Sequence, residues 1–290
     1  MLPEGAIRFT DVTKTYHIIR RATPRMGAWL LSKAFEHFRR EPFQALHGMS
    51  FEVAPGEIVG LLGHNGAGKS TVLKLIAGIT QPTGGSVEVA GSVASLLELG
   101  VGFHEDLTGM ENIFYNGAMM GMTRVQILER LPRIIEFSGL ADFLYEPVKH
   151  YSSGMYSRLA CSVALHLDPK IILVDEILAV GDAEFQQRGI LKILELHEQG
   201  TTILLVTHET AAARDLCDRL IWIDHGQIVD EGEPRRIHNA YMKATLSKTL
   251  EESVFNTPIT PGGPDHAHIE SVKFFVDGEE SDLIHTGQAA

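Results

Sequence analysis

Apolar and polar positions divide the chain into short strands separated by helices. Residues 6–12 (AIRFTDV) alternate between apolar and polar side chains, which predicts a strand with one buried face. The apolar runs at 58–62, 171–174 and 202–206 are typical of strands that helices cover on both faces. Further strands are predicted at 49–53, 86–89, 93–97, 220–223 and 228–229.

Helical periodicity fills most intervals between the predicted strands. Residues 109–144 carry Met and Leu at helical spacing, and another helix begins near Met155. On that second helix, Leu159, Val163 and Leu167 share one face. Further helices are predicted at 71–77, 184–198, 211–217 and 234–246. Because strands alternate with helices, the sequence predicts an α/β fold in which helices cover a mostly parallel sheet.

Composition narrows the class of protein. Apolar residues make up 44% of the chain and charged residues 21%, which excludes a mostly disordered protein. A net charge of −12 argues against a protein that wraps nucleic acid. The chain has no run of 18 apolar residues and no signal-peptide pattern at its start, so neither a membrane-spanning helix nor secretion is expected. Cys161 and Cys217 are predicted to be buried free thiols of a reducing compartment.

A phosphate-binding loop follows the apolar run at 58–62. The sequence GHNGAGKS fits the pattern G-x-x-x-x-G-K-[ST] and lies between a predicted strand and a predicted helix. Its glycines let backbone N–H groups curl around phosphates, Lys69 can reach the β and γ oxygens, and Ser70 can ligate Mg²⁺. The predicted nucleotide-binding residues here are Gly63, His64, Asn65, Gly66, Ala67, Gly68, Lys69, Ser70 and Thr71.

Two further strands end in groups suited to hydrolysis. Asp175 and Glu176 directly follow the apolar run at 171–174. Because ligands bind at the carboxyl ends of parallel strands, Asp175 is expected to hold Mg²⁺ and Glu176 to orient or deprotonate the attacking water. His208 follows the run at 202–206 and is expected to contact the γ-phosphate at the same edge of the sheet.

A fourth motif points to one family. The sequence YSSGM at 151–155 opens a predicted helix and resembles the Leu-Ser-Gly-Gly-Gln signature of ABC ATPases. With the motifs above, it makes residues 6–246 similar to an ABC nucleotide-binding domain. The resemblance implies that Tyr16 stacks on adenine. It also implies a head-to-tail homodimer, in which Asp182 touches the partner. The residues that would cover the partner's ATP are Ser152, Ser153, Gly154 and Met155.

Several positions depart from the ABC pattern. Ser153 replaces the first signature glycine, and Met155 replaces the glutamine. The glutamine that usually begins the loop sensing the membrane subunit is also absent. Glu98 is the nearest candidate at that place, and its carboxylate could still meet Mg²⁺.

The branch of the family follows from longer stretches. The segments GFHEDLTGMENI, YSSGM and EILAVGDAEFQQR together resemble ATPase subunits of bacterial exporters of O-antigen, capsule or teichoic acid. This resemblance implies an ATP hydrolase that uses ATP and Mg²⁺. It implies transmembrane permease subunits as partners, a lipid-linked polysaccharide as substrate, and a place on the cytoplasmic face of the inner membrane.

Alternative functions carry less weight on this sequence. A soluble ABC ATPase of DNA repair or translation would need long coiled-coil insertions or a second ATPase domain, and neither is present. A non-catalytic ATP-binding regulator fits poorly with an intact Glu176 and His208. An ABC transporter for another substrate stays open as the alternative function.

A basic insertion lies between the first two predicted strands of the domain, at residues 17–42. One face of a predicted helix there is apolar and the other is charged. The apolar face comprises Leu30, Leu31, Ala34, Phe35 and Phe38, and the charged face Lys33, Glu36, Arg39 and Arg40. Such a helix suits either a membrane or permease surface, or packing on its own domain.

The composition changes again near residue 257, where TPITPGGPDH reads as a linker. Residues 269–276 then predict a strand without partners, which resembles the opening of a carbohydrate-binding β-sandwich in some O-antigen exporter ATPases. The expected layout is an ABC nucleotide-binding domain at 1–248 with a helical subdomain at 109–168, a linker at 249–268, and at 269–290 a truncated β-rich domain that continues beyond this sequence.

Overall fold

The structure is a computed structural model, and it describes residues 2–21, 38–96, 100, 102–175, 181–207, 210–256, 274–276 and 279–281. Among the predicted site residues, Glu98, Glu176 and His208 lie outside this part of the chain. The chain divides into two units, Met1–Thr245 and Leu246–Ala290, which are described separately.

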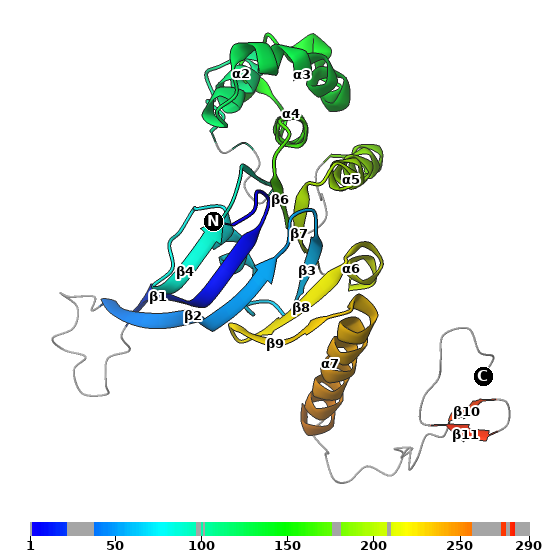
Figure 1. Ribbon diagram of the computed structural model, residues 1–290. Helices are drawn as coiled ribbons and strands as arrows, with labels where there is room; N and C mark the ends of the chain where they lie inside the picture. The colour runs from blue at the N-terminus through cyan, green and yellow to red at the C-terminus, as the bar shows by residue number, and fades with distance from the viewer. Residues whose placement is uncertain are drawn as a thin grey trace, which may run out of the picture. The chain divides into compact units, whose positions relative to one another are not determined.

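A six-stranded sheet forms the centre of the first unit (Figure 1). The strands lie in the order β5 (Val93–Ser95), β6 (Ile171–Asp175), β7 (Thr202–Val206), β3 (Ile58–Leu62), β8 (Arg219–Asp224) and β9 (Gln227–Gly232). Neighbouring strands from β5 to β8 are parallel, and only β8 and β9 pair antiparallel. Every residue of β3 and β7 is buried, which confirms the prediction of strands covered on both faces.

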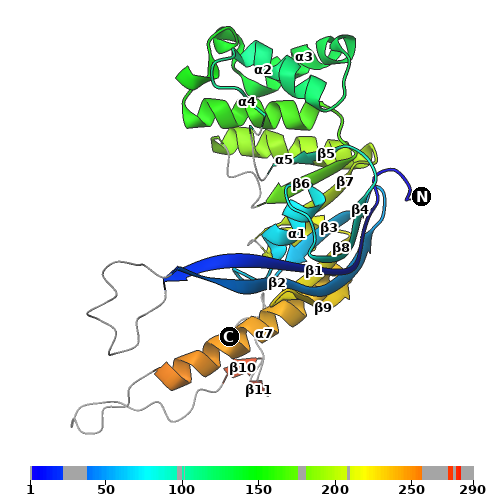
Figure 2. The ribbon, with the colours of Figure 1, turned by 90° about the vertical axis from the view of Figure 1, so that its left-hand side faces the viewer.

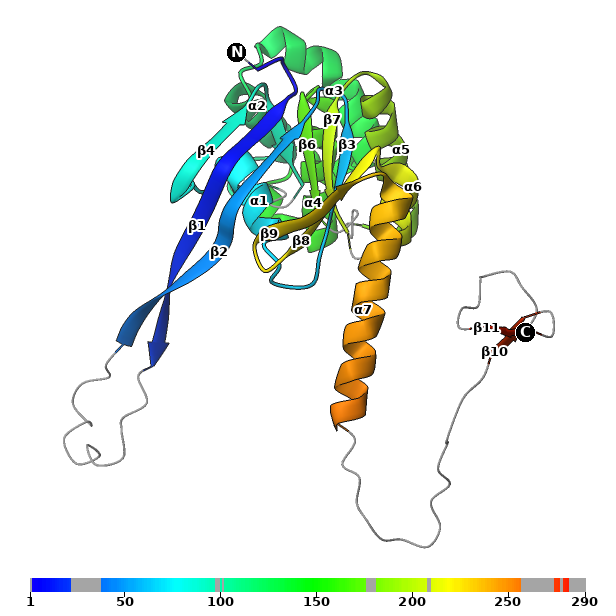
Figure 3. The same ribbon diagram turned by 60° about the horizontal axis from the view of Figure 1, so that its bottom comes forward.

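A second, antiparallel sheet has the order β2 (Phe38–Val53), β1 (Ile7–Arg21) and β4 (Gly84–Val89). Beyond Thr13, β1 pairs only with β2 among the described strands, and Figures 2 and 3 show the two as a ribbon that runs away from the other elements of the unit. Both strands are much longer than the predicted segments 6–12 and 49–53.

The last residues of the helix predicted in the insertion form part of this ribbon, so the prediction is wrong for them. Phe38, Arg39 and Arg40 belong to strand β2, where they pair with Arg21, Arg20 and Ile19. Helical spacing suggested otherwise because it measures only local side-chain order, whereas strand pairing depends on a distant segment. Residues 30–36 of the predicted helix lie outside the described residues.

Helices cover both faces of the central sheet. Helix α1 (Lys69–Ile76) packs between the two sheets, and its Val72 and Leu73 are fully buried with Phe9 and Leu61 in one core cluster. On the opposite face, Phe185 of α5 (Ala183–Glu198) and Ala213 of α6 (Thr210–Leu216) join a second cluster. Cys161 and Cys217 belong to this second core as free thiols, as predicted.

A helical subdomain has its own core. It contains α2 (Gly109–Met119), α3 (Arg124–Ser138) and α4 (Ser153–His166), with short 3-10 turns at Ala141–Phe143 and Val148–His150. Capping boxes begin α2 at Thr108 and α3 at Thr123, which explains why the predicted helical region 109–144 breaks into separate helices. The predicted face of Leu159, Val163 and Leu167 is buried in this core.

The C-terminal elements depart from the predictions. Helix α7 (Pro234–Asn256) extends past the predicted end at residue 246, so the predicted linker begins as a helix. In the second unit, β10 (Phe274–Val276) and β11 (Glu279–Ser281) form an antiparallel hairpin. The prediction of an unpartnered tail strand is therefore wrong for residues 274–276. Within the described residues, no helix has the length and apolar character needed to cross a membrane.

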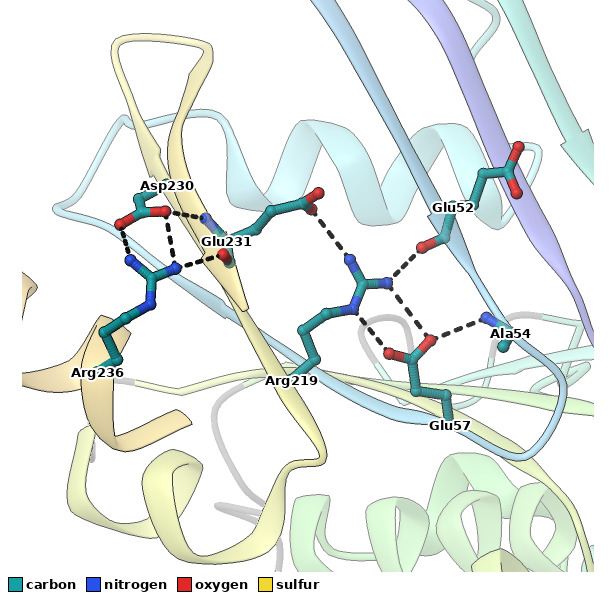
Figure 4. Close-up of polar contacts among 7 residues, drawn as sticks. All are labelled: Glu52, Ala54, Glu57, Arg219, Asp230, Glu231 and Arg236. Carbon is teal, nitrogen blue, oxygen red and sulfur yellow. Dashed lines mark hydrogen bonds and ion pairs between the residues drawn. The ribbon is translucent and has the colours of Figure 1, made fainter. Parts of the chain in front are cut away.

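An arginine links strands from both sheets (Figure 4). Arg219 of β8 donates from Nε to Glu57 at 2.7 Å and from Nη1 to Glu231 of β9 at 3.0 Å. Its Nη2 donates to the carbonyl oxygen of Glu52 in β2. Glu57 in turn accepts from the backbone N–H of Ala54 at 2.8 Å, so the carboxylate also shapes the turn between β2 and β3.

Candidate nucleotide-binding site

The phosphate loop joins β3 to α1, in the strand–loop–helix context that the motif requires. Lys69 lies at the start of the helix, and its side chain donates to the backbone carbonyls of Gly63 at 2.6 Å and His64 at 3.0 Å. Only 6% of Lys69 is exposed. The loop therefore holds the ammonium group in place by its own backbone, ready for an anion at the helix N-terminus.

Two glycines let the loop pack closely against its neighbours. Gly63 has φ +154°, and a Cβ there would lie 2.2 Å from the carbonyl oxygen of Ile223. Gly68 has φ +112°, and a Cβ there would lie 3.1 Å from the carbonyl oxygen of Ala45. A side chain at position 63 would push the loop away from β8, and one at position 68 would push it away from β2. Both positions are therefore glycine, which has no Cβ.

A cavity of about 230 Å³ lies above the loop. Its walls come from β1, β2, the loop, α1, β6 and β7. The lining residues are Tyr16, Phe43, Ala45, Asn65, Gly66, Gly68, Lys69, Ser70, Thr71, Asp175 and Val206. The structure thus brings together Tyr16, much of the loop and Asp175, which are widely separated in the sequence. Of the predicted loop residues, Gly63, His64 and Ala67 do not line the cavity.

Phe43 is a lining residue that the sequence analysis missed. It is directly opposite Tyr16 in the β1–β2 pairing and is 49% exposed. Sequence alone offered no signal, because Phe43 falls at the edge of the basic insertion and its relation to Tyr16 depends on strand register.

Ser70 and Asp175 are suited to a divalent cation. Ser70 is the second residue of α1, and Asp175 is the last residue of β6, where it stands opposite Val206 of β7. Both line the same cavity. A hydroxyl and a carboxylate oxygen are hard donors of the kind Mg²⁺ prefers, so these residues fit a nucleotide-bound Mg²⁺.

The signature residues begin helix α4. Ser152 caps the helix, since its hydroxyl accepts from the backbone N–H of Met155 at 3.2 Å. Ser153, Gly154 and Met155 form the first turn. None of these residues lines the cavity of the same chain. Their predicted contact with ATP therefore calls for a second chain.

Asp182 has a local structural role. It caps helix α5, because its carboxylate accepts from the backbone N–H of Phe185 at 2.8 Å. Its other oxygen lies 3.8 Å from Arg158 of α4. This contact links the start of α5 to the helical subdomain, while the predicted contact of Asp182 with a partner chain stays a prediction.

Comparisons with known proteins agree with this geometry. The sequence matches the ABC transporter family over residues 46–179. It is 43% identical over 243 residues to an O-antigen export system ATP-binding protein of Klebsiella pneumoniae, covering 83% of this chain and 99% of that one. It is 46% identical over 220 residues to an O-antigen export system ATP-binding protein of Myxococcus xanthus. The matched part covers 76% of this chain and 50% of that protein. The chain is also 40% identical over 250 residues to a teichoic acids export ATP-binding protein of Bacillus anthracis. That match covers 85% of this chain and 44% of that protein.

Solved structures show the same fold. An ATP-binding subunit of an ABC transporter superposes with a TM-score of 0.65 at 24% identity, covering 81% of this chain and 92% of that chain. The phosphate loop, the strand-end aspartate and the separate helical subdomain define an ATPase with the ATP-binding-cassette fold. The chain belongs to the ABC transporter family, as an ATP-binding protein that hydrolyses ATP.

Proposed function

We propose that this chain is the ATP-hydrolysing subunit of a transporter that exports a lipid-linked polysaccharide of the O-antigen type. The observation that carries the proposal is the 43% identity that extends over 99% of the Klebsiella O-antigen export protein. The likeness to a teichoic acids export protein supports the same chemical class, since both names describe export of a cell-surface glycan polymer.

The proposed hydrolysis uses residues from the loop and the strand ends. Lys69 binds the β- and γ-phosphate oxygens, while loop N–H groups bind the remaining phosphate oxygens. Ser70 and Asp175 would hold Mg²⁺, which neutralises phosphate charge when bound. Glu176 orients the attacking water and accepts its proton, and His208 contacts the γ-phosphate. The burial of Lys69 and the shared cavity of Ser70 and Asp175 support these roles.

The proposed active form is a head-to-tail homodimer. Residues 152–155 of one chain would cover the ATP bound by the loop of the other, and Asp182 would lie at the contact. A helix N-terminus with small residues in front is a second anion-binding element. Its absence from the cavity of its own chain supports an arrangement in which the partner supplies it.

Permease subunits are the proposed second partner. They would bring the chain to the cytoplasmic face of the inner membrane. Glu98 would stand at the start of the loop that senses the permease and could approach Mg²⁺. We also propose that residues 17–42 dock at the permease or membrane surface. The β1–β2 ribbon supports this, because its far end, residues 17–21 and 38–42, runs away from the other elements of the unit.

The C-terminal residues 269–290 are proposed to begin a β-rich region that binds the exported glycan. The proposal rests on the resemblance stated above and on the hairpin of β10 and β11. The Pro- and Gly-containing stretch from residue 257 would connect it to the ATPase domain.

Transport in membrane vesicles tests the proposed function. The full chain would be co-expressed with a candidate permease, and inverted vesicles would be loaded on their outer surface with lipid-linked polysaccharide. ATP should move the glycan into the lumen, where an added glycosidase cannot reach it. The Lys69→Ala variant is the control and should leave the glycan exposed. Normal ATP hydrolysis with no protected glycan would overturn polysaccharide export and favour another substrate.

A further inference from the structure

We propose that His64, Asp224 and His225 form a binding site for a divalent transition-metal ion of the Zn²⁺ class, apart from the proposed Mg²⁺ position. Each side chain offers one ligand atom, and the three atoms lie within 4.8 Å of one another. Two imidazole nitrogens and one carboxylate oxygen form a donor set that selects zinc, cobalt or nickel over magnesium. None of the three residues lines the nucleotide cavity.

The contacts of His64 orient its second ring nitrogen toward Asp224. Nδ1 lies 2.6 Å from the carbonyl oxygen of Asn65, and because a carbonyl can only accept, Nδ1 carries the hydrogen. Nε2 then faces Oδ1 of Asp224 at 2.6 Å. The ring is therefore oriented with Nε2 toward the carboxylate, so that both atoms can approach one ion. Metal-binding histidines commonly donate their other N–H to a backbone carbonyl in this way.

The three donors lie near the spacing that a small ion requires, and small side-chain shifts would reach it. Donor atoms that share a tetrahedral zinc lie about 3.3 Å apart, given metal–ligand distances near 2 Å. The distance from Asp224 Oδ1 to His64 Nε2 is 2.6 Å, and to His225 Nε2 it is 4.0 Å. To share one ion, the first pair would separate by about 0.7 Å and the second would approach by about 0.7 Å. The His225 side chain is 82% exposed, so it can turn toward the ion without disturbing the core.

Backbone contacts fix the two sides of this site against each other. Asp224 pairs with Gln227, and between them His225 has φ +45° and Gly226 φ +73°, which makes a tight two-residue turn between β8 and β9. The Gly226 N–H donates to the carbonyl oxygen of Ala67 in the phosphate loop at 2.8 Å. The turn and the loop are therefore held together before any ion binds.

The backbone at position 225 permits a matched substitution. Histidine, like asparagine and aspartate, is enriched at positive φ, so the residue type fits the turn. Asparagine is compatible with the same backbone, so His225→Asn removes a ligand while keeping the turn.

Cobalt titration of tag-free protein tests the site. The probe is Co²⁺ alone, followed by its visible ligand-field absorption, with Zn²⁺ added afterwards as competitor. The full chain should bind one equivalent that Zn²⁺ displaces and millimolar Mg²⁺ does not. His225→Asn should weaken binding by about tenfold or more, and Asp224→Asn likewise. The matched control is His238→Asn, which changes a half-buried histidine outside the cluster and should bind as the unmodified chain does.

Two results would overturn the proposal. One is equal Co²⁺ affinity in the His225→Asn variant and the unmodified chain, with thermal melting unchanged. The other is loss of the Co²⁺ signal on addition of Mg²⁺, which would place the ion at the nucleotide site. Because the turn tolerates asparagine, the His225→Asn result stands even where Asp224→Asn fails to fold.

Discussion

Tyr16 and Phe43 stand directly opposite each other on β1 and β2, and both line the cavity above the phosphate loop. Lys14 lies over the Tyr16 ring, with its Nζ 5.0 Å from the ring centroid. Lys14 is held there by hydrogen bonds to Thr80 and Gln81. The rim of the cavity therefore carries two aromatic rings, one of them beneath a hydrogen-bonded cation, and we expect the base of a nucleotide to stack there.

Removing either aromatic ring should weaken nucleotide binding. Stacking of a base on an aromatic side chain contributes about 1–3 kcal/mol, so Tyr16→Ala should raise the Kd for ATP by about 5- to 150-fold. Tyr16→Phe should keep most of the affinity, and Phe43→Ala should have a smaller effect than Tyr16→Ala. Titration with a fluorescent ATP analogue measures this. Tyr115→Ala, which removes a ring that is also 49% exposed but lies in α2, is the matched control.

Glu176 should be needed for hydrolysis and not for binding. Loss of a general base lowers a rate by about 100-fold or more, so Glu176→Gln should release phosphate very slowly while it still binds ATP and accumulates as a dimer. Lys69→Ala should instead lose affinity for ATP. Phosphate release and size-exclusion chromatography with ATP separate the two effects. Unchanged turnover in Glu176→Gln would disprove the assignment of Glu176 as the base.

Loss of Arg219 should destabilise the domain. Its side chain is 23% exposed and that of Glu57 17%, so Arg219→Leu leaves a largely buried carboxylate without its main partner. The expected loss in free energy of unfolding is about 2 kcal/mol. Arg236→Leu is the control, because that arginine pairs with Asp230 at a more exposed position and should cost less. Urea denaturation followed by circular dichroism compares the variants, and equal losses would contradict the role of burial.

The two thiols should be unreactive in the folded protein. Burial raises the pKa of Cys161 from 9.0 to about 12, and the pKa of Cys217 is raised equally to about 12. Thiolate is then nearly absent at neutral pH, and a disulfide reagent should label neither residue until the chain unfolds. The unfolded chain loses these protons near pH 9, so stability should fall as pH rises from 9 toward 12. Cys161→Ala with Cys217→Ala should remove that part of the pH dependence.

Apolar residues of the insertion should matter for export and not for ATP binding. Replacing Leu31, Phe35 and Phe38 with Ser should impair transport or assembly with the permease, because it removes the apolar surface proposed to dock there. Binding of ATP by the isolated chain should be unchanged. Transport in the vesicle assay at the level of the unmodified chain would show that the insertion has no docking role.

Local patterns predicted much of this protein correctly. The buried strands β3, β6 and β7 appeared as apolar runs, because each needs only its own side chains to reveal burial on both faces. The phosphate loop was equally readable, since its glycines and Lys69 act within one short segment. Asp175 was expected near the loop because ligand-binding groups gather at the carboxyl ends of parallel strands, and Asp175 and the loop do line one cavity.

Tertiary structure decided what depends on distant segments. The extension of β1 and β2, the placing of Phe43 beside Tyr16 and the approach of His64 to Asp224 each join residues that share no local pattern. The helical spacing at residues 30–40 gave a wrong prediction for its last three residues. Backbone pairing with residues 19–21 places Phe38, Arg39 and Arg40 in a strand. Hydrophobic periodicity records which face of a segment is buried, whereas strand register and loop packing are set by the partner segment, whose identity appears only when the chain has folded.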